Sequence, residues 1–213
     1  MKDAKLTEFD DETQKDHAYL RADDDCYYLI EYTARRAFNY SDANSFISNL
    51  KKKPSLKGTY QWAHKSAAIR TAGETLSREL PKDWLKKSTF VPIPPSKSKT
   101  HAEYDDRMSR VLKRLDGADV RELVYQAKNM EATHVSSDRH SIETLVANYE
   151  IDEDLTKPEP KHIVIVDDMM TAGAHYRAVR RVLGKRFPKI PISGVFLARR
   201  IFAKKETEHE DDE

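Results

Sequence analysis

The residues that most strongly suggest chemistry are two adjacent carboxylates, Asp167 and Asp168, which directly follow the apolar run 163–166. That run, Ile-Val-Ile-Val, is typical of a strand buried on both faces of a parallel sheet. Two carboxylates at the end of such a strand repel each other unless cations or hydroxyl groups lie in front of them. We therefore expect a polar ligand there, with sugar hydroxyls or a metal-bound group on the acids.

The small residues after the acidic pair predict a phosphate site. Thr171, Ala172, Gly173 and Ala174 would allow backbone N–H groups to approach a ligand closely. A helical spacing of apolar residues begins at Ala174, so a helix N-terminus would face the same space as the acids. Such a terminus favours anions. The alternative is an ordinary strand, loop and helix in which the two acids are solvated.

The segment Val166-Asp-Asp-Met-Met-Thr-Ala-Gly-Ala-His175 resembles the phosphoribosyl pyrophosphate (PRPP) signature of type I phosphoribosyltransferases. The resemblance implies that Asp167 and Asp168 are catalytic and accept hydrogen bonds from the ribose hydroxyls. It also implies a 5′-phosphate site made by Thr171, Ala172, Gly173, Ala174 and His175. The family usually has Thr or Ser where this chain has His175, so either His175 replaces that hydroxyl or backbone donors do its work.

A basic turn upstream is the expected pyrophosphate site. The apolar segment 89–93 predicts a strand, and it is followed by two prolines that fix a rigid turn. Ser96 and Lys97 then supply a hydroxyl and a positive charge. The alternative is a surface turn with solvated lysines. Here the chain resembles ComF-type phosphoribosyltransferase-like proteins, in which a Val-Pro-x-Pro segment precedes a basic stretch; the zinc ribbon that many of them carry is absent.

Periodicity predicts the supporting elements. We expect an edge strand at 27–33, a helix capped by Ser41, a long helix from Thr59 to Pro81, an amphipathic helix at 108–115 and a final strand at 192–197. The resemblance implies an α/β fold of the type I phosphoribosyltransferase kind: a twisted, mostly parallel sheet flanked by helices, with a small N-terminal hood-like appendage.

Three regions are expected along the chain. Residues 1–24 form a polar arm, either mobile or wrapped on the surface; residues 25–203 form the α/β domain; residues 204–213 form an acidic disordered tail. A mobile loop is expected at about 126–138. Arg139 and His140 after it either reach the pyrophosphate or begin a helix without a chemical role. The lysines 51–53 are interpreted chiefly as a solvated helix end, with a phosphate or nucleic-acid contact as the alternative.

The composition of the chain limits which classes of binding partner are expected. Lys and Arg total 37 against 36 Asp and Glu, so net charge does not indicate nucleic acid, although a local patch is compatible with it. The single Cys26 excludes an internal disulfide and suggests a reducing cytoplasm. No apolar run approaches the roughly 20 residues that span a bilayer, so no membrane partner is expected. A homodimer is compatible with the sequence.

The resemblance implies a magnesium-dependent phosphoribosyltransferase that transfers the 5-phosphoribosyl group between PRPP and a nitrogenous acceptor such as a nucleobase, with release of pyrophosphate. Mg²⁺ is expected mainly through PRPP rather than through protein ligands. The alternative is a non-catalytic PRPP-binding or nucleotide-binding sensor, or a DNA-processing accessory of ComF type. A receiver-like domain that uses Asp167 and Asp168 for magnesium and phosphorylation is disfavoured, because the acidic pair lies far toward the C-terminus.

Overall fold

The core of the protein is a mostly parallel sheet, as the sequence predicts. The computed structural model describes residues 1, 3–128 and 141–203. Six strands pair in the order β1-β2-β8-β7-β3-β4, and only β1 is antiparallel to its neighbour. The strands are β1 (Thr7–Glu8), β2 (Cys26–Ala34), β3 (Thr89–Pro92), β4 (Asp119–Val120), β7 (Ile163–Met170) and β8 (Ile192–Phe202). A separate antiparallel pair joins β5 (Val124–Gln126) to β6 (Tyr149–Ile151).

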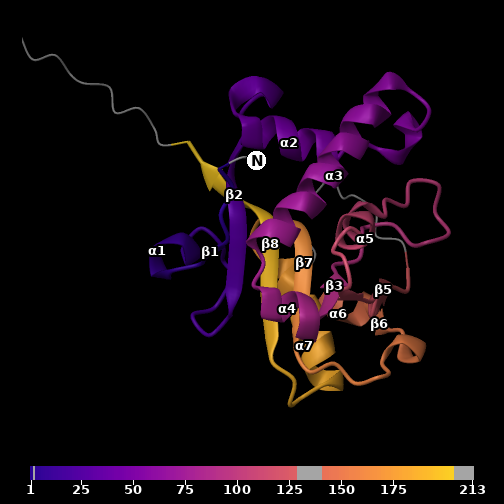
Figure 1. The fold of residues 1–213 in the computed structure, drawn as a ribbon. Coiled ribbons are helices and arrows are strands. Elements are labelled where there is room, and N and C mark those ends of the chain that lie inside the picture. Colours follow the sequence, from indigo (N-terminus) through magenta and orange to yellow (C-terminus); the bar gives the residue numbers. More distant parts are fainter. Residues whose placement is uncertain (2, 129–140, 204–213) are drawn as a thin grey trace, which may run out of the picture.

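Helices cover both faces of this sheet (Figure 1). They are α1 (Asp11–Gln14), α2 (Asp42–Leu50), α3 (Tyr60–Glu79), α4 (Lys82–Lys87), α5 (Arg107–Leu112), α6 (Ile142–Asn148) and α7 (Ala174–Arg186), with short 3-10 turns η1 (Phe38–Tyr40), η2 (Pro54–Leu56) and η3 (Glu153–Leu155). The expected cap at Ser41 and the expected end of the long helix at Pro81 are confirmed. The Ser41 hydroxyl accepts a hydrogen bond from Asn44 N at 3.1 Å, and α3 stops just before Pro81.

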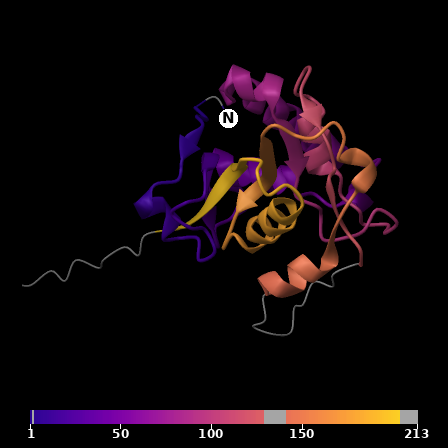
Figure 2. The same ribbon diagram turned by 90° about the horizontal axis from the view of Figure 1, so that it is seen from below.

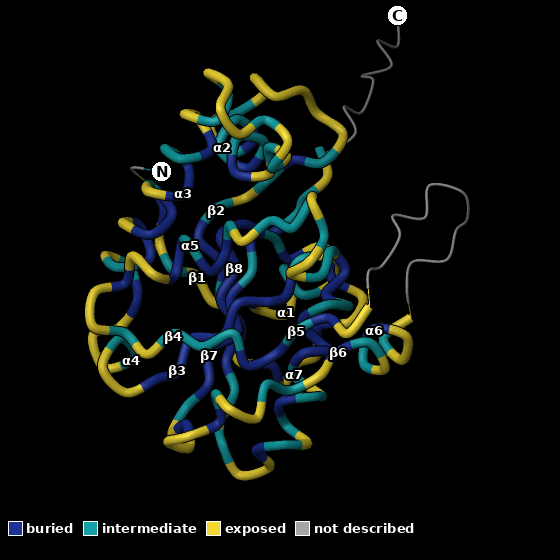
Figure 3. Tube along the Cα trace, turned by 90° about the vertical axis from the view of Figure 1, so that its right-hand side faces the viewer, coloured by how far each residue is buried: buried dark blue, intermediate teal, exposed yellow. Residues whose placement is uncertain are grey.

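Strand β7 divides the apolar core in two because its side chains alternate between the faces. Ile163 and Ile165 pack with α7 and α6, whereas Val164 and Val166 pack with α3 and α5. Figure 2 shows the two groups of helices on opposite sides of the strands, and Figure 3 shows the buried strands between them. Among the described residues, no helix combines the length and apolar character needed to cross a membrane.

The expectation that the signature strand ends at Val166 was wrong. β7 continues to Met170, because β8 is longer than predicted and pairs Asp167 with Phe196 and Met169 with Ala198. Asp167 and Asp168 therefore lie inside a strand. Their side chains point to opposite faces of the sheet, since consecutive strand residues alternate.

The N-terminal segment is wrapped on the surface rather than mobile in its described part. β1 pairs with β2, Phe9 is buried with its ring centroid 4.9 Å from that of Tyr28, and Leu20 joins the same core. Asp24 forms salt bridges with Arg177 and Arg180 of α7. The predicted tail 204–213 lies outside the described residues, as does most of the predicted loop.

The connections create a crevice at the carboxyl ends of β3 and β7. After β3 the chain enters α5 on one face, whereas after β7 it enters α7 on the other face. Where connections from neighbouring parallel strands diverge in this way, an open α/β sheet leaves room for a ligand. The segments that follow these two strands are the two that carry the predicted site.

Candidate functional site

A cavity of about 310 Å³ occupies this crevice. Five of the residues predicted from the sequence line it: Ser96, Asp167, Asp168, Thr171 and His175. Lys97 lines an adjoining cavity of about 270 Å³ on the other side of the Pro94–Pro95 turn. The predicted loop residues Arg139 and His140 lie outside the described part of the chain.

Asp168 is an ion-paired carboxylate on the α5 face of β7. Its side chain is only 4% exposed, Arg107 Nε donates to its Oδ2 at 2.7 Å, and Lys51 Nζ lies 3.1 Å from its Oδ1. Burial alone would raise the pKa of Asp168, but the two cations outweigh burial and hold that pKa below its ordinary value. Asp168 is thus ionised, and its charge is balanced by Arg107 and Lys51.

A buried network fixes the guanidinium of Arg107. Arg107 Nη1 donates to Asp105 Oδ2 at 2.9 Å, and the same oxygen accepts from the fully buried Lys65 Nζ at 2.7 Å. Lys65 Nζ also donates to the carbonyls of Leu50 and Lys52 at 2.9 and 2.7 Å. Burial lowers the pKa of Lys65, and Asp105 opposes this shift. The network joins α3, α5 and the end of α2 to β7, so the cations at the cavity wall are held in place.

Asp167, unlike Asp168, has no ion-pair partner among the described residues. Its Oδ1 accepts from the backbone N of Asp168 at 2.7 Å, but no cation of the described residues lies within ion-pair distance of it. Burial, followed by repulsion from the charge of Asp168, raises the pKa of Asp167. A carboxyl group in this state can both accept a hydrogen bond from a ligand hydroxyl and donate one to a ligand oxygen.

Residues of the N-terminal segment contact the backbone carbonyls of the loop after β7. Thr171 O contacts His17 Nδ1, and Ala172 O accepts from Tyr19 N at 2.9 Å. No described residue supplies an acceptor for the N–H groups of residues 171–174. Gly173 caps α7 with φ of 90°, a conformation that favours glycine. Open amides at the start of a 13-residue helix are suited to an anion.

His175 stands where the family resemblance led us to expect a hydroxyl. Its Nδ1 lies 2.8 Å from the hydroxyl of Tyr149, at the start of β6. The ring is therefore oriented by the chain segment that returns from α6, and it lines the cavity beside Thr171.

Sequence reasoning missed three residues that shape the site: Lys51, Arg107 and Tyr149. The lysine run indicates chiefly a solvated helix end, and Arg107 is notable in the sequence only as the residue before an amphipathic helix. Lys51 and Arg107 contact Asp168 only because α2 and α5 approach β7 in the fold. Neither local sequence pattern indicates this approach. An Arg directly after Asp105 and Asp106 was the single local signal for a charge network.

A protein-held metal does not fit the described residues, which contain no group of three or more His, Cys, Asp or Glu side chains able to hold one. Asp168 and Asp105 are already paired with cations. Mg²⁺ commonly binds through substrate phosphates with only one or two protein carboxylates. The site is therefore compatible with a substrate-borne magnesium, for which Asp167 is the available oxygen donor.

Fold and site define the class of protein: an α/β protein with a charged cavity at the carboxyl ends of its central strands. Neither the known family models nor the curated protein sequences contain a match to this chain. Its function is consequently inferred from the geometry of the cavity.

Proposed function

We propose that the protein is a magnesium-dependent phosphoribosyltransferase with a type I fold, which transfers the 5-phosphoribosyl group between PRPP and a nitrogenous acceptor such as a nucleobase. One arrangement carries the proposal. A carboxyl group without a cation, the loop residues Thr171 and His175, and two fixed cations all border one cavity of the described structure. The amides without an acceptor among the described residues belong to the same loop, but Ala172, Gly173 and Ala174 do not line the cavity. Ribose hydroxyls, a 5′-phosphate and a pyrophosphate are the three matching parts of PRPP.

In this proposal the 5′-phosphate binds the amides of residues 171–174, where the dipole of α7 adds to the attraction. Asp167 accepts hydrogen bonds from the ribose hydroxyls. Ser96, Lys51 and Arg107 face the pyrophosphate, and Lys97 adds positive charge from the adjoining cavity. Asp168 positions the two cations rather than binding ribose, because both of its oxygens already have partners.

The reaction breaks the bond between the anomeric carbon and a pyrophosphate oxygen, and the electron pair leaves with pyrophosphate. The lone pair of the acceptor nitrogen forms the new bond, and the acceptor proton is lost to solvent. Asp167 in its charged form would favour the cationic ribose ring. Magnesium carried by PRPP would neutralise the leaving group together with Arg107 and Lys51, and a well-placed donor of this kind contributes roughly 3 kcal/mol. The free, buried thiol of Cys26 fits a cytoplasmic setting.

A second candidate is a non-catalytic PRPP or nucleotide sensor. One observation favours it: Asp168 is neutralised within the protein, so Asp167 is the member of the acidic pair that stays available to ribose. A site that retains phosphate and ribose contacts while lacking the second carboxylate would bind PRPP without turning it over.

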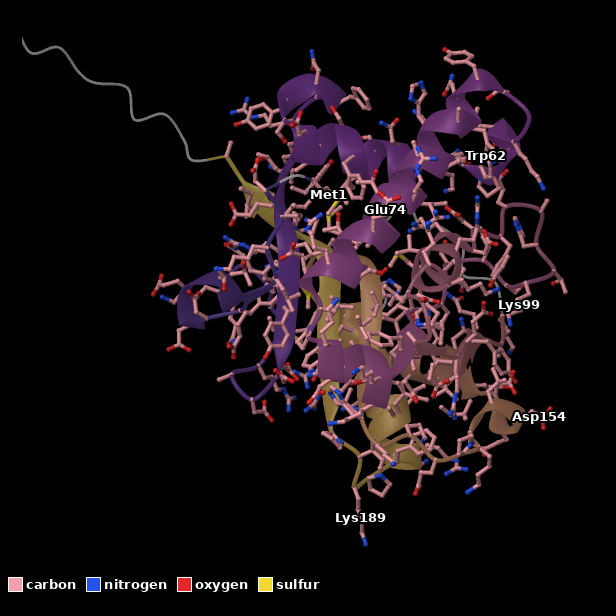
Figure 4. All side chains as sticks on the ribbon, viewed as in Figure 1. Met1, Trp62, Glu74, Lys99, Asp154 and Lys189 are labelled. Carbon is pink, nitrogen blue, oxygen red and sulfur yellow. The ribbon has the colours of Figure 1, made fainter. Side chains whose placement is uncertain are left out.

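Calorimetry with PRPP and Mg²⁺ tests PRPP binding, which both candidate functions require. We expect binding, and we expect Asp167→Asn to weaken it about tenfold, the cost of roughly one charged hydrogen bond. Asp154→Asn is the matched control, because Asp154 lies on η3 away from the cavity (Figure 4). Pyrophosphate release with a panel of nucleobases then separates the candidates. Absence of PRPP binding by the wild-type protein would refute both.

A further inference from the structure

A surface outside the cavity combines exposed aromatic rings with cations. The described residues include five exposed large hydrophobic side chains, and four of them belong to elements near one end of the sheet: Phe38 and Tyr40 in η1, Tyr60 at the start of α3 and Phe202 at the end of β8. Figure 1 shows α2, the start of α3 and the end of β8 at the same end of the molecule. Exposed aromatic rings that gather in this way commonly mark a binding surface. We call Arg35, Arg36, Phe38, Tyr40, Lys52 and Phe202 the aromatic–basic surface.

The members of this surface are paired with one another. Lys52 Nζ lies 5.9 Å from the centre of the Phe38 ring. Arg36 Cζ lies 5.3 Å from the centre of the Tyr40 ring, and Arg35 Cζ lies 5.6 Å from the centre of the Phe202 ring. The backbone brings the third pair together, because Ala34 at the end of β2 is in register with Phe202 at the end of β8. About half of each of the three aromatic residues is nevertheless exposed: 50% for Phe38, 51% for Tyr40 and 50% for Phe202.

The charge of this region differs from that of the whole chain. Residues 35–60 contain six Lys or Arg and a single acidic residue, Asp42, whereas the complete chain has a net charge of +1. The rest of the protein must therefore be acidic on balance. A local excess of this size attracts a polyanion although the net charge of the protein does not.

We propose that the aromatic–basic surface binds single-stranded nucleic acid. Cations would contact the phosphates while Phe38, Tyr40 and Phe202 stack on unpaired bases, the combination that binds single strands with little dependence on sequence. Paired bases are stacked inside a duplex and offer no open ring face, so single strands are preferred. The surface leads toward the cavity, because Lys51 next to Lys52 contacts Asp168.

Fluorescence anisotropy with a labelled oligo-dT strand of about 20 nucleotides, longer than the usual span of one binding module, tests this proposal, and an abasic strand of equal length tests the stacking. We expect the wild-type protein to bind oligo-dT at least about tenfold more tightly than the abasic strand. The double variant Phe38→Ala, Tyr40→Ala should lose about tenfold or more for oligo-dT and little for the abasic strand. Tyr19→Ala removes an exposed aromatic ring elsewhere and should leave both affinities unchanged.

The charge contribution is tested by the salt dependence of binding. Lys52→Ala with Lys53→Ala should weaken binding of both strands, and it should reduce the slope of log K against log salt by about 0.7 for each phosphate that the variant no longer neutralises. The charge-matched control is Lys185→Ala with Lys189→Ala, because Lys189 projects from the opposite end of the molecule (Figure 4).

Three results would overturn the proposal: no binding of oligo-dT at low salt, equal affinity for the abasic strand, or losses as large in the control variants as in the surface variants. Binding to vesicles of anionic phospholipid without binding to oligo-dT would also overturn it and would assign the surface to a membrane. None of these measurements uses PRPP, so a negative result leaves the proposed function standing, and the reverse holds as well.

Discussion

The two ends of the central sheet both carry polar side chains, but they use them in opposite ways. At the end where the parallel strands begin, His162 is bound on both sides: its Nδ1 lies 2.8 Å from the Ser88 hydroxyl and its Nε2 lies 2.8 Å from the Ser193 hydroxyl. Ser193 in turn donates to Asp25, and the ring of Trp84 packs edge-on against His162 at 5.0 Å. Both ring nitrogens are satisfied by the protein itself.

At the end where the strands finish, polar groups are held in place and left available. Arg107 is fixed by Asp105 and Asp168, yet it borders a cavity, and the loop 171–174 is anchored through its carbonyls while its amides have no acceptor among the described residues. Buried polar groups usually find partners within the protein. Amides that are positioned without an acceptor among the described residues therefore distinguish the end that we propose binds a ligand from the end that seals the sheet.

The largest expected effect comes from breaking the charge pairs at the cavity end of the sheet. Asp168→Ala should lower the free energy of unfolding by about 3 kcal/mol, because Arg107 and Lys51 would lose their counter-charge in a largely buried setting. Urea denaturation measures this change. Adding Arg107→Met to Asp168→Ala should recover part of the loss, since the unpaired cation is then removed. A loss below about 0.5 kcal/mol would show that the pairs are solvated like those of a surface.

The sealed end should affect stability alone. His162→Ala removes both hydrogen bonds and leaves the hydroxyls of Ser88 and Ser193 without this partner, so we expect a loss of about 2 kcal/mol in unfolding free energy. PRPP affinity measured by calorimetry should not change. A substantial fall in PRPP affinity in a folded variant would mean that the two ends are coupled and would weaken the contrast between them.

Asp167, the carboxyl group without a cationic partner among the described residues, should have a smaller effect on the free energy of unfolding, and this effect depends on pH. Burial and Asp168 raise the pKa of Asp167 to about 7, so the folded protein keeps a proton that the unfolded chain has already released above the ordinary carboxyl pKa. The contribution of Asp167 to the free energy of unfolding therefore falls as pH rises from about 4 to 7. Asp167→Asn cannot ionise and should raise the unfolding free energy by at least about 1 kcal/mol at a pH of about 8, with no gain near pH 4. Thermal denaturation at both values measures it, and an equal gain at the two would show that the carboxyl does not titrate in this range.

The sequence predicted the elements of the site better than their relation to one another. The apolar run 163–166, the cap at Ser41, the helical spacing that begins at Ala174 and the break at Pro81 are local signals, and each was sufficient to locate an element. The opposite orientation of Asp167 and Asp168 was not predictable, because it depends on pairing between β7 and β8 beyond Val166. Arg107 and Lys51 were missed for the same reason: their partner Asp168 lies 61 residues or more away along the chain.

The smallest expected effect concerns Lys97, which the sequence placed at the pyrophosphate and which borders the adjoining cavity instead of the polar one. Acting across the Pro94–Pro95 turn, its charge is partly screened, so Lys97→Ala should weaken PRPP binding by about threefold, a free-energy change of roughly 0.7 kcal/mol. Affinity for ribose 5-phosphate, which lacks the pyrophosphate, should stay the same, and Lys185→Ala serves as the charge control. Equal losses for the two ligands would place Lys97 outside the leaving-group site and leave Ser96, Lys51 and Arg107 as the described residues that bind the pyrophosphate.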